Sequence, residues 1–235
     1  RYNQFVWWDS EIHQMPFFIY TAPETAKHLL MYRYKMLPQA KKNAKMNGMD
    51  GAMFAFCSSV EGDERVWVYA RHPFLQIHLN SDIPYGIIHY YTATGDEEFM
   101  KNYGMEMIHE CLKFWRCRVV EKNGRYEILR VTGTDEHHPY VDNDAYTNYC
   151  VHFIFGKFLE LTEKLGYKIS KAEAAAFKHI YDNIYVPMLP NGMIPQFDGY
   201  FDLSRTLEEV GKGTLKQFQM KKSGLYHKSQ EIGRA

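Results

Sequence analysis

Apolar residues recur at helical spacing along much of this chain, and this periodicity constrains the fold more than any other feature. The clearest example keeps an i, i+4, i+8 rhythm for about five turns. Its members are Phe99, Met100, Tyr103, Met107, Ile108, Cys111, Leu112 and Trp115. No alternating apolar and polar run is long enough to predict a convincing strand. The chain is therefore expected to be all-α.

The expected helices come in pairs that are separated by a short turn, and each pair is followed by a long polar loop. Two segments with capping-box spacing, at Thr21–Glu24 and Ser170–Glu173, predict helix starts. Pro38 is expected to end the first helix and leave a second helical piece over Gln39–Met46, and Asp82 is expected to cap another helix. Such antiparallel pairs describe a helical array or toroid with its long loops at one end. A helical solenoid shares this rhythm, but no fixed repeat is visible.

Composition and charge limit the classes of function. The 235 residues, 46% hydrophobic, are enough for one large core, which predicts a single domain over residues 1–235. Lys plus Arg and Asp plus Glu both number 28, so no charge excess favours nucleic acid or an anionic membrane. No membrane-spanning run or signal peptide is found, and the four cysteines follow no metal or redox spacing, so buried reduced thiols and a cytoplasmic location are expected.

The segment of residues 131–148, VTGTDEHHPYVDNDAYTN, concentrates ionisable groups between two expected helices. Proton-transfer groups in a loop held by rigid elements favour catalysis. Ordinary turn and cap residues are the alternative interpretation, with Asp144 capping the next helix. A metal site at His137, His138 and Asp142 is a third interpretation, which no metal-binding motif supports.

Near the N-terminus, Trp7, Trp8 and Asp9 place aromatic faces beside a carboxylate. Indole faces stack on sugar C–H groups and carboxylates accept hydroxyl protons, so the pattern suits a sugar site. A buried aromatic strip that meets a polar turn explains the same residues.

Together these segments resemble the catalytic domain of glycoside hydrolase family 65, which includes maltose, trehalose and kojibiose phosphorylases. The matching pieces are WWDSE with MPFF, LLMYRYKMLPQAKKNA, GMDGAMF, EGDE, IHLNSDIPYGIIHYYTATGDEEF, YGMEMIHECLKFW, VTGTDEHHPYVDNDAYTNY, MIPQFDGYFDL and LKQ. They follow the family's order over most of the chain. The resemblance implies an (α/α)6 barrel, here incomplete.

The resemblance also implies roles for five residues. Glu136 matches the general acid of the family. Trp8 and Asp9 match the pair that holds the glucosyl unit, and Lys216 and Gln217 match a second pair on the same sugar. No metal and no cofactor is implied, and inorganic phosphate is the expected co-substrate.

The implied reaction is phosphorolysis of a glucose disaccharide with inversion, which yields β-glucose 1-phosphate and a free sugar. An inverting enzyme needs a protonated acid at the leaving oxygen, and burial or the neighbouring Asp135 is expected to keep Glu136 protonated. A hydrolase on the same scaffold and a sugar-binding domain without turnover are the alternatives. The segment that holds the nucleophile is expected beyond residue 235, in a longer polypeptide, and a homodimer is compatible with the sequence.

Overall fold

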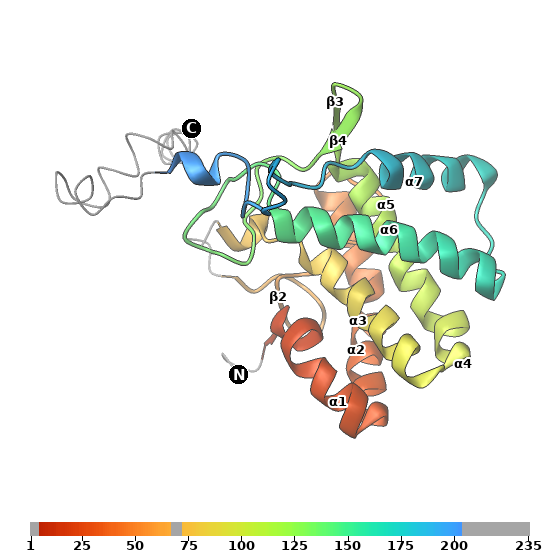
Figure 1. Ribbon diagram of the computed structural model, residues 1–235. Helices are drawn as coiled ribbons and strands as arrows, with labels where there is room; N and C mark the ends of the chain where they lie inside the picture. Colours follow the sequence, from red (N-terminus) through yellow and green to blue (C-terminus); the bar gives the residue numbers. More distant parts are fainter. Residues whose placement is uncertain (1–4, 67–71, 204–235) are drawn as a thin grey trace.

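The computed structural model describes residues 5–66 and 72–203, and these residues are mainly helical (Figure 1). The principal helices are α1 (Met15–Thr21), α2 (Pro23–Met46), α3 (Leu79–Thr94), α5 (Met105–Arg118), α6 (Ala145–Leu165) and α7 (Lys171–Asn183). Shorter helical pieces are η2 (Ser10–Gln14), η3 (His72–Leu75), α4 (Glu97–Phe99), η4 (Met100–Gly104) and η5 (Tyr200–Asp202). Because α4, η4 and α5 follow one another without a break, they form one long helix. The predominance of helices confirms the predicted all-α fold.

The helices form two layers. Helices α1, α3 and α6 pack side by side in one layer, and α2, α5 and α7 pack in the other. Each helix of the first layer also packs against its successor in the second layer: α1 on α2, α3 on α5, and α6 on α7. This is the arrangement of helix pairs in an (α/α)6 barrel, and the described residues supply three such pairs.

The length of the connections alternates, and this alternation decides where a site can form. The turns within a pair are short: Ala22, Gly95–Asp96, and residues 166–170. The connections from one pair to the next are long, at residues 47–78 and 119–144. Both long connections lead to the starts of the first-layer helices α3 and α6, which lie on the left of Figure 1, and the β3–β4 part of the second connection stands at the top. The sequence predicted such a gathering of long loops at one end.

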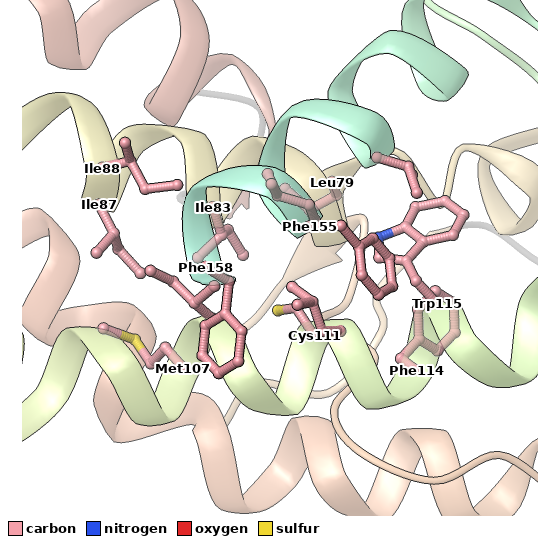
Figure 2. Packing of buried hydrophobic residues seen from close by; sticks show 14 of the residues in the cluster. Leu79, Ile83, Ile87, Ile88, Met107, Cys111, Phe114, Trp115, Phe155 and Phe158 are labelled. Atoms are coloured by element: carbon pink, nitrogen blue, oxygen red, sulfur yellow. The ribbon is translucent and has the colours of Figure 1, made fainter. Parts of the chain in front are cut away.

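The core lies between the two layers. Figure 2 shows Ile83 and Ile87 of α3, Cys111 and Trp115 of α5, and Phe155 and Phe158 of α6 facing one another. All are fully buried. The apolar stripe predicted over residues 99–115 is therefore the contact face of the long helix, and its methionines pack in the core.

Two short sheets accompany the helices, although the sequence predicted no strand. Strand β1 (Val6–Trp7) pairs antiparallel with β2 (Cys57–Ser58), and β3 (Val120–Lys122) pairs antiparallel with β4 (Arg125–Glu127). The β3–β4 hairpin turns at Asn123 and Gly124, which both have positive φ. The Asn-Gly pair is a strong hairpin signal that the periodicity analysis overlooked.

Several predicted helix boundaries were wrong. Helix α2 continues through Pro38 to Met46, because proline is tolerated in a long helix that tertiary packing stabilises. Thr21 does not cap α2; its hydroxyl donates to the carbonyl of Phe17. Ser170, in contrast, caps α7 through the backbone N–H of Glu173, as predicted.

The cysteines are all free, but they are not all buried. Cys57 and Cys111 are buried, Cys150 is half-buried and Cys117 is exposed. Cys117 lies on the face of α5 that points away from the core, so the prediction of burial was wrong for this residue.

Candidate active site

The loop between α5 and α6 carries Glu136. Asp135, the residue before Glu136, stabilises the shape of this loop. The Asp135 carboxylate accepts hydrogen bonds from Gln196 Nε2 at 2.9 Å and from the backbone N–H of His137 at 3.0 Å. His138 Nδ1 lies 2.7 Å from the same carboxylate. Partial burial alone raises the pKa of Asp135, but these hydrogen bonds outweigh it and lower the pKa below its ordinary value. Asp135 therefore stabilises the loop as a carboxylate.

Glu136 lies in the turn of this loop and its side chain is exposed. The burial expected for Glu136 is therefore not found among the described residues. The backbone N–H groups of His137 and His138 donate to Asp135, so hydrogen bonds fix the turn in which the exposed Glu136 side chain lies.

The base of the loop is tightly packed against the start of α6. A methyl group on Gly133 would lie 2.1 Å from Asp144 Oδ1, so only glycine fits there. Asp144 caps α6 by accepting from the backbone N–H of Thr147 at 2.8 Å, which confirms its capping role. Burial raises the pKa of Asp144, although the hydrogen bonds from Thr147 act in the opposite direction.

The chain that follows α7 supports the same loop from the other side. The backbone N–H of Asp198 donates to the carbonyl of Asp142, and Asn143 Nδ2 donates to Asp198 Oδ2 at 2.7 Å. Asn143, Tyr140 and Arg130 have positive φ, a conformation that is strained for residues other than glycine. Three such residues in one loop mean that the surrounding contacts impose its shape.

The segment with Trp8 and Asp9 is held by a buried ion pair that the sequence analysis missed. Arg33 Nε and Nη2 donate to the Glu11 carboxylate at 2.6 and 2.9 Å. Both side chains are almost completely buried. Arg33 Nη2 also donates to the carbonyl of Trp7, so α2 anchors the backbone beside Trp8.

A second missed cluster connects Trp8 with α3 and α6. His78 Nδ1 lies 2.7 Å from Asp82 Oδ2, and the Tyr146 hydroxyl donates to Asp82 Oδ1 at 2.8 Å. The His78 ring meets the Trp8 indole edge to face, with 5.0 Å between ring centroids. Asp82 therefore binds two side chains and does not cap α3, which corrects the sequence interpretation. The i, i+4 spacing of His78 and Asp82 was the available signal.

The predicted site residues are only partly brought together by the described structure. Contacts connect Trp8 to the Glu136 loop through His78, Tyr146 and α6, so both lie at the loop-bearing end. Asp9 lines a cavity of about 460 Å3 with Trp7, Glu11 and Tyr32, a cavity that neither Trp8 nor Glu136 lines. Lys216 and Gln217 lie outside the described residues.

Metal ligation and membrane insertion find no support in the part of the chain that the structure describes. Within residues 5–66 and 72–203, no group of three His, Cys, Asp or Glu side chains is placed to hold a metal ion. His138 is instead engaged with Asp135. In the same residues, no helix has the length and apolar character needed to cross a bilayer.

The fold and these loops define part of a helical (α/α) barrel, with polar loops at one end of its helix pairs. Residues 1–230 match the family model described as the glycosyl hydrolase family 65 central catalytic domain, and the chain belongs to this family. The resemblance inferred from the sequence motifs is thus confirmed.

Curated relatives and a solved structure agree with this assignment. The chain is 53% identical to the 3-O-alpha-D-glucosyl-L-rhamnose phosphorylase of Lachnoclostridium phytofermentans, over 99% of this chain and 32% of that protein. It is 40% identical to the kojibiose phosphorylase of Thermoanaerobacter brockii, over 86% of this chain and 29% of that protein. A solved structure from the human microbiome, proposed to be a kojibiose phosphorylase, superposes with a TM-score of 0.79 at 26% identity, over 92% of this chain and 33% of that chain. The chain thus spans about a third of the length of these relatives.

Proposed function

We propose that the full-length protein containing this chain is an inverting α-glucoside phosphorylase. It cleaves a glucose disaccharide with inorganic phosphate and releases β-glucose 1-phosphate and a free sugar. In this proposal Glu136 is the general acid, and Trp8, Asp9, Lys216 and Gln217 hold the glucosyl unit.

One arrangement supports the proposal most. Within a chain of family 65, an exposed carboxyl group on a fixed loop lies at the same end of the helix pairs as the half-buried indole of Trp8. A sugar that stacks on the indole would therefore bind at the same end of the helix pairs as the carboxyl group. The relatives named above are phosphorylases, which favours phosphate over water as the nucleophile.

The chemistry requires little more from this part of the protein. Protonation of the leaving oxygen by Glu136 lowers the barrier to bond cleavage. Phosphate is already ionised, so the opposite face of the sugar needs groups that bind an anion and no second carboxylate as base. Inorganic phosphate is then a co-substrate, with no other cofactor.

Similarity to the relatives narrows the candidates for the disaccharide substrate and hence for the sugar that is released. The 53% identical relative acts on 3-O-α-glucosyl-rhamnose, and other relatives act on kojibiose, nigerose and trehalose. The glucosyl-rhamnose disaccharide is therefore the first substrate to test, with the other three as alternatives.

The test is to incubate the full-length protein with each disaccharide, with and without phosphate. Phosphate consumption matched by β-glucose 1-phosphate is expected for at least one disaccharide. Cleavage at the same rate without phosphate would identify a hydrolase instead. Glucose binding by calorimetry without any cleavage would identify a sugar-binding domain.

The same proposal extends to the cellular compartment and the oligomeric state of the full-length protein. Its substrates are small sugars and phosphate, without nucleic acid or membrane, which suits an enzyme of the cytoplasm. Sedimentation of the full-length protein would distinguish a monomer from the homodimer that the sequence allows.

A further inference from the structure

His78 is a completely buried histidine beside a residue of the proposed sugar site. None of its surface is exposed, so it cannot touch a sugar directly. Its Nε2 atom has no hydrogen-bond partner among the described residues. A buried polar atom without a partner costs stability and calls for an explanation.

The orientation of the His78 ring is set from one side by Asp82. An ionised Asp82 can only accept, so it takes one hydrogen bond from His78 Nδ1 and one from the Tyr146 hydroxyl. Burial, followed by the negative charge of Asp82, raises the pKa of Tyr146 well above its ordinary value. Tyr146 therefore remains a donor at neutral pH, and the carboxylate keeps both partners.

The His78 ring also packs against Trp8. The planes of His78 and Trp8 meet at 86°, and those of His78 and Tyr146 at 89°. His13 contacts the same indole, with ring centroids 5.2 Å apart. Since both imidazoles contact the indole, loss or rotation of the His78 ring would change the packing that holds Trp8 in place.

We propose that His78, oriented by Asp82 and Tyr146, is a positioning residue that fixes the indole of Trp8 for sugar binding. This inference rests on the sugar-binding role of Trp8 in the proposed function. It assigns to the first turns of α3 and α6 a part in substrate recognition that acts through Trp8.

A double-mutant cycle in the full-length protein tests the inference. The variants are His78→Asn, which retains a donor toward Asp82 but removes the ring, Trp8→Ala, and the double variant. His78→Asn is expected to weaken glucose binding about tenfold by calorimetry and to raise KM more than it lowers kcat. In the Trp8→Ala background, His78→Asn should have no further effect on binding, because the indole that it positions is gone.

His109→Asn is the matched control. His109 is likewise packed among aromatic rings, those of Phe158 and Phe177, and lies 3.0 Å from the carboxylate of Glu173. It belongs to α5, away from Trp8, so its replacement should lower the thermal midpoint without changing glucose affinity. Tyr146→Phe, which keeps the ring but removes the donor to Asp82, provides a milder second variant should His78→Asn fail to fold, and it should also weaken binding only when Trp8 is present.

The outcomes separate this inference from the proposed function. If the effects of His78→Asn and Trp8→Ala on glucose affinity add, or if neither His78→Asn nor Tyr146→Phe changes affinity, the positioning role is overturned. If the wild-type protein binds glucose but consumes no phosphate, the proposed function fails while the cycle still decides the role of His78. A wild-type protein without sugar binding overturns both.

Discussion

Two adjacent acidic residues, Asp135 and Glu136, lie in different surroundings. Asp135 is engaged by Gln196, His138 and a backbone N–H, whereas Glu136 is exposed in the following turn. A carboxylate that already accepts several hydrogen bonds is a poor proton donor. Asp135 is therefore the member of the pair that shapes the loop.

The first prediction is that Glu136→Gln removes acid catalysis selectively. The amide keeps the shape of the side chain but cannot protonate the leaving oxygen, so turnover of the disaccharide should fall by a factor of about 10² to 10⁴. An α-glucosyl fluoride, whose leaving group needs no proton, should be largely unaffected. Asp135→Asn should reduce turnover of both substrates alike. An equal loss on both substrates in Glu136→Gln would assign the acid to another residue.

The second prediction concerns the pH dependence of the loop. Because the pKa of Asp135 in the folded protein lies below its ordinary value of 3.8, its carboxylate stabilises the fold above that pH. This contribution is lost as the pH falls through the lowered pKa. The difference in unfolding free energy between the wild type and Asp135→Asn should therefore be largest near neutrality and shrink below about pH 4. Denaturant titrations over this range measure it, and a difference that grows on acidification would contradict the assignment.

At the scale of elements, α2 shows how packing overrides a local signal. Its buried face includes Leu30, Arg33 and Leu37, and the helix runs unbroken through Pro38. Pro38 itself is exposed, so its ring contributes nothing to the core. The helix accepts a missing backbone hydrogen bond because it packs against α1, α3 and α5.

The third prediction is that Pro38→Ala stabilises the full-length protein. Alanine restores the backbone donor and removes the steric conflict, for a gain of about 1 to 3 kcal/mol in unfolding free energy. Lys35→Ala, at another exposed position of the same helix, serves as the control and should change stability by less than about 0.5 kcal/mol. The measurement is denaturant unfolding, and a loss of stability in Pro38→Ala would show that the proline has a structural role.

At the scale of the whole molecule, the loop-bearing end depends on contacts between elements that are distant in sequence. The buried pair of Glu11 and Arg33 joins the segment before α1 to the middle of α2. Burial is the largest effect on Glu11 and raises its pKa, with Arg33 acting in the opposite direction. The attraction therefore compensates for the loss of water only while both partners are present.

The fourth prediction follows from this dependence. Arg33→Met should destabilise the protein by about 3 to 5 kcal/mol, because it leaves the Glu11 charge buried without a partner. The double variant Arg33→Met/Glu11→Leu should recover most of that loss. Lys41→Met is the matched control. Lys41 lies on α2, like Arg33, but its ion pair with Glu106 of α5 is at the exposed surface. Its replacement should lower the unfolding free energy by less than about 1 kcal/mol. A double variant no more stable than Arg33→Met would contradict a role for the unpaired charge.

Local patterns in the sequence determined most of the helices, the caps at Asp144 and Ser170, and the order of the loops. The stripe over residues 99–115, the cap at Ser170 and the turn at Gly166 depend on neighbours within a few residues, so they could be predicted. The motifs also carried the family, because they occur in a fixed order along the chain.

Only the tertiary structure decided which polar residues meet. The pairing of Glu11 with Arg33 and the contact of His78 with Trp8 join residues 22 or more positions apart. The continuity of α2 at Pro38 depends on tertiary packing that no short sequence window contains. The support of the Glu136 loop by Gln196 and Asp198 likewise joins residues 55 to 61 positions apart in sequence. Hydrogen bonds and burial act through space, so a sequence can name such residues without showing which of them share a site.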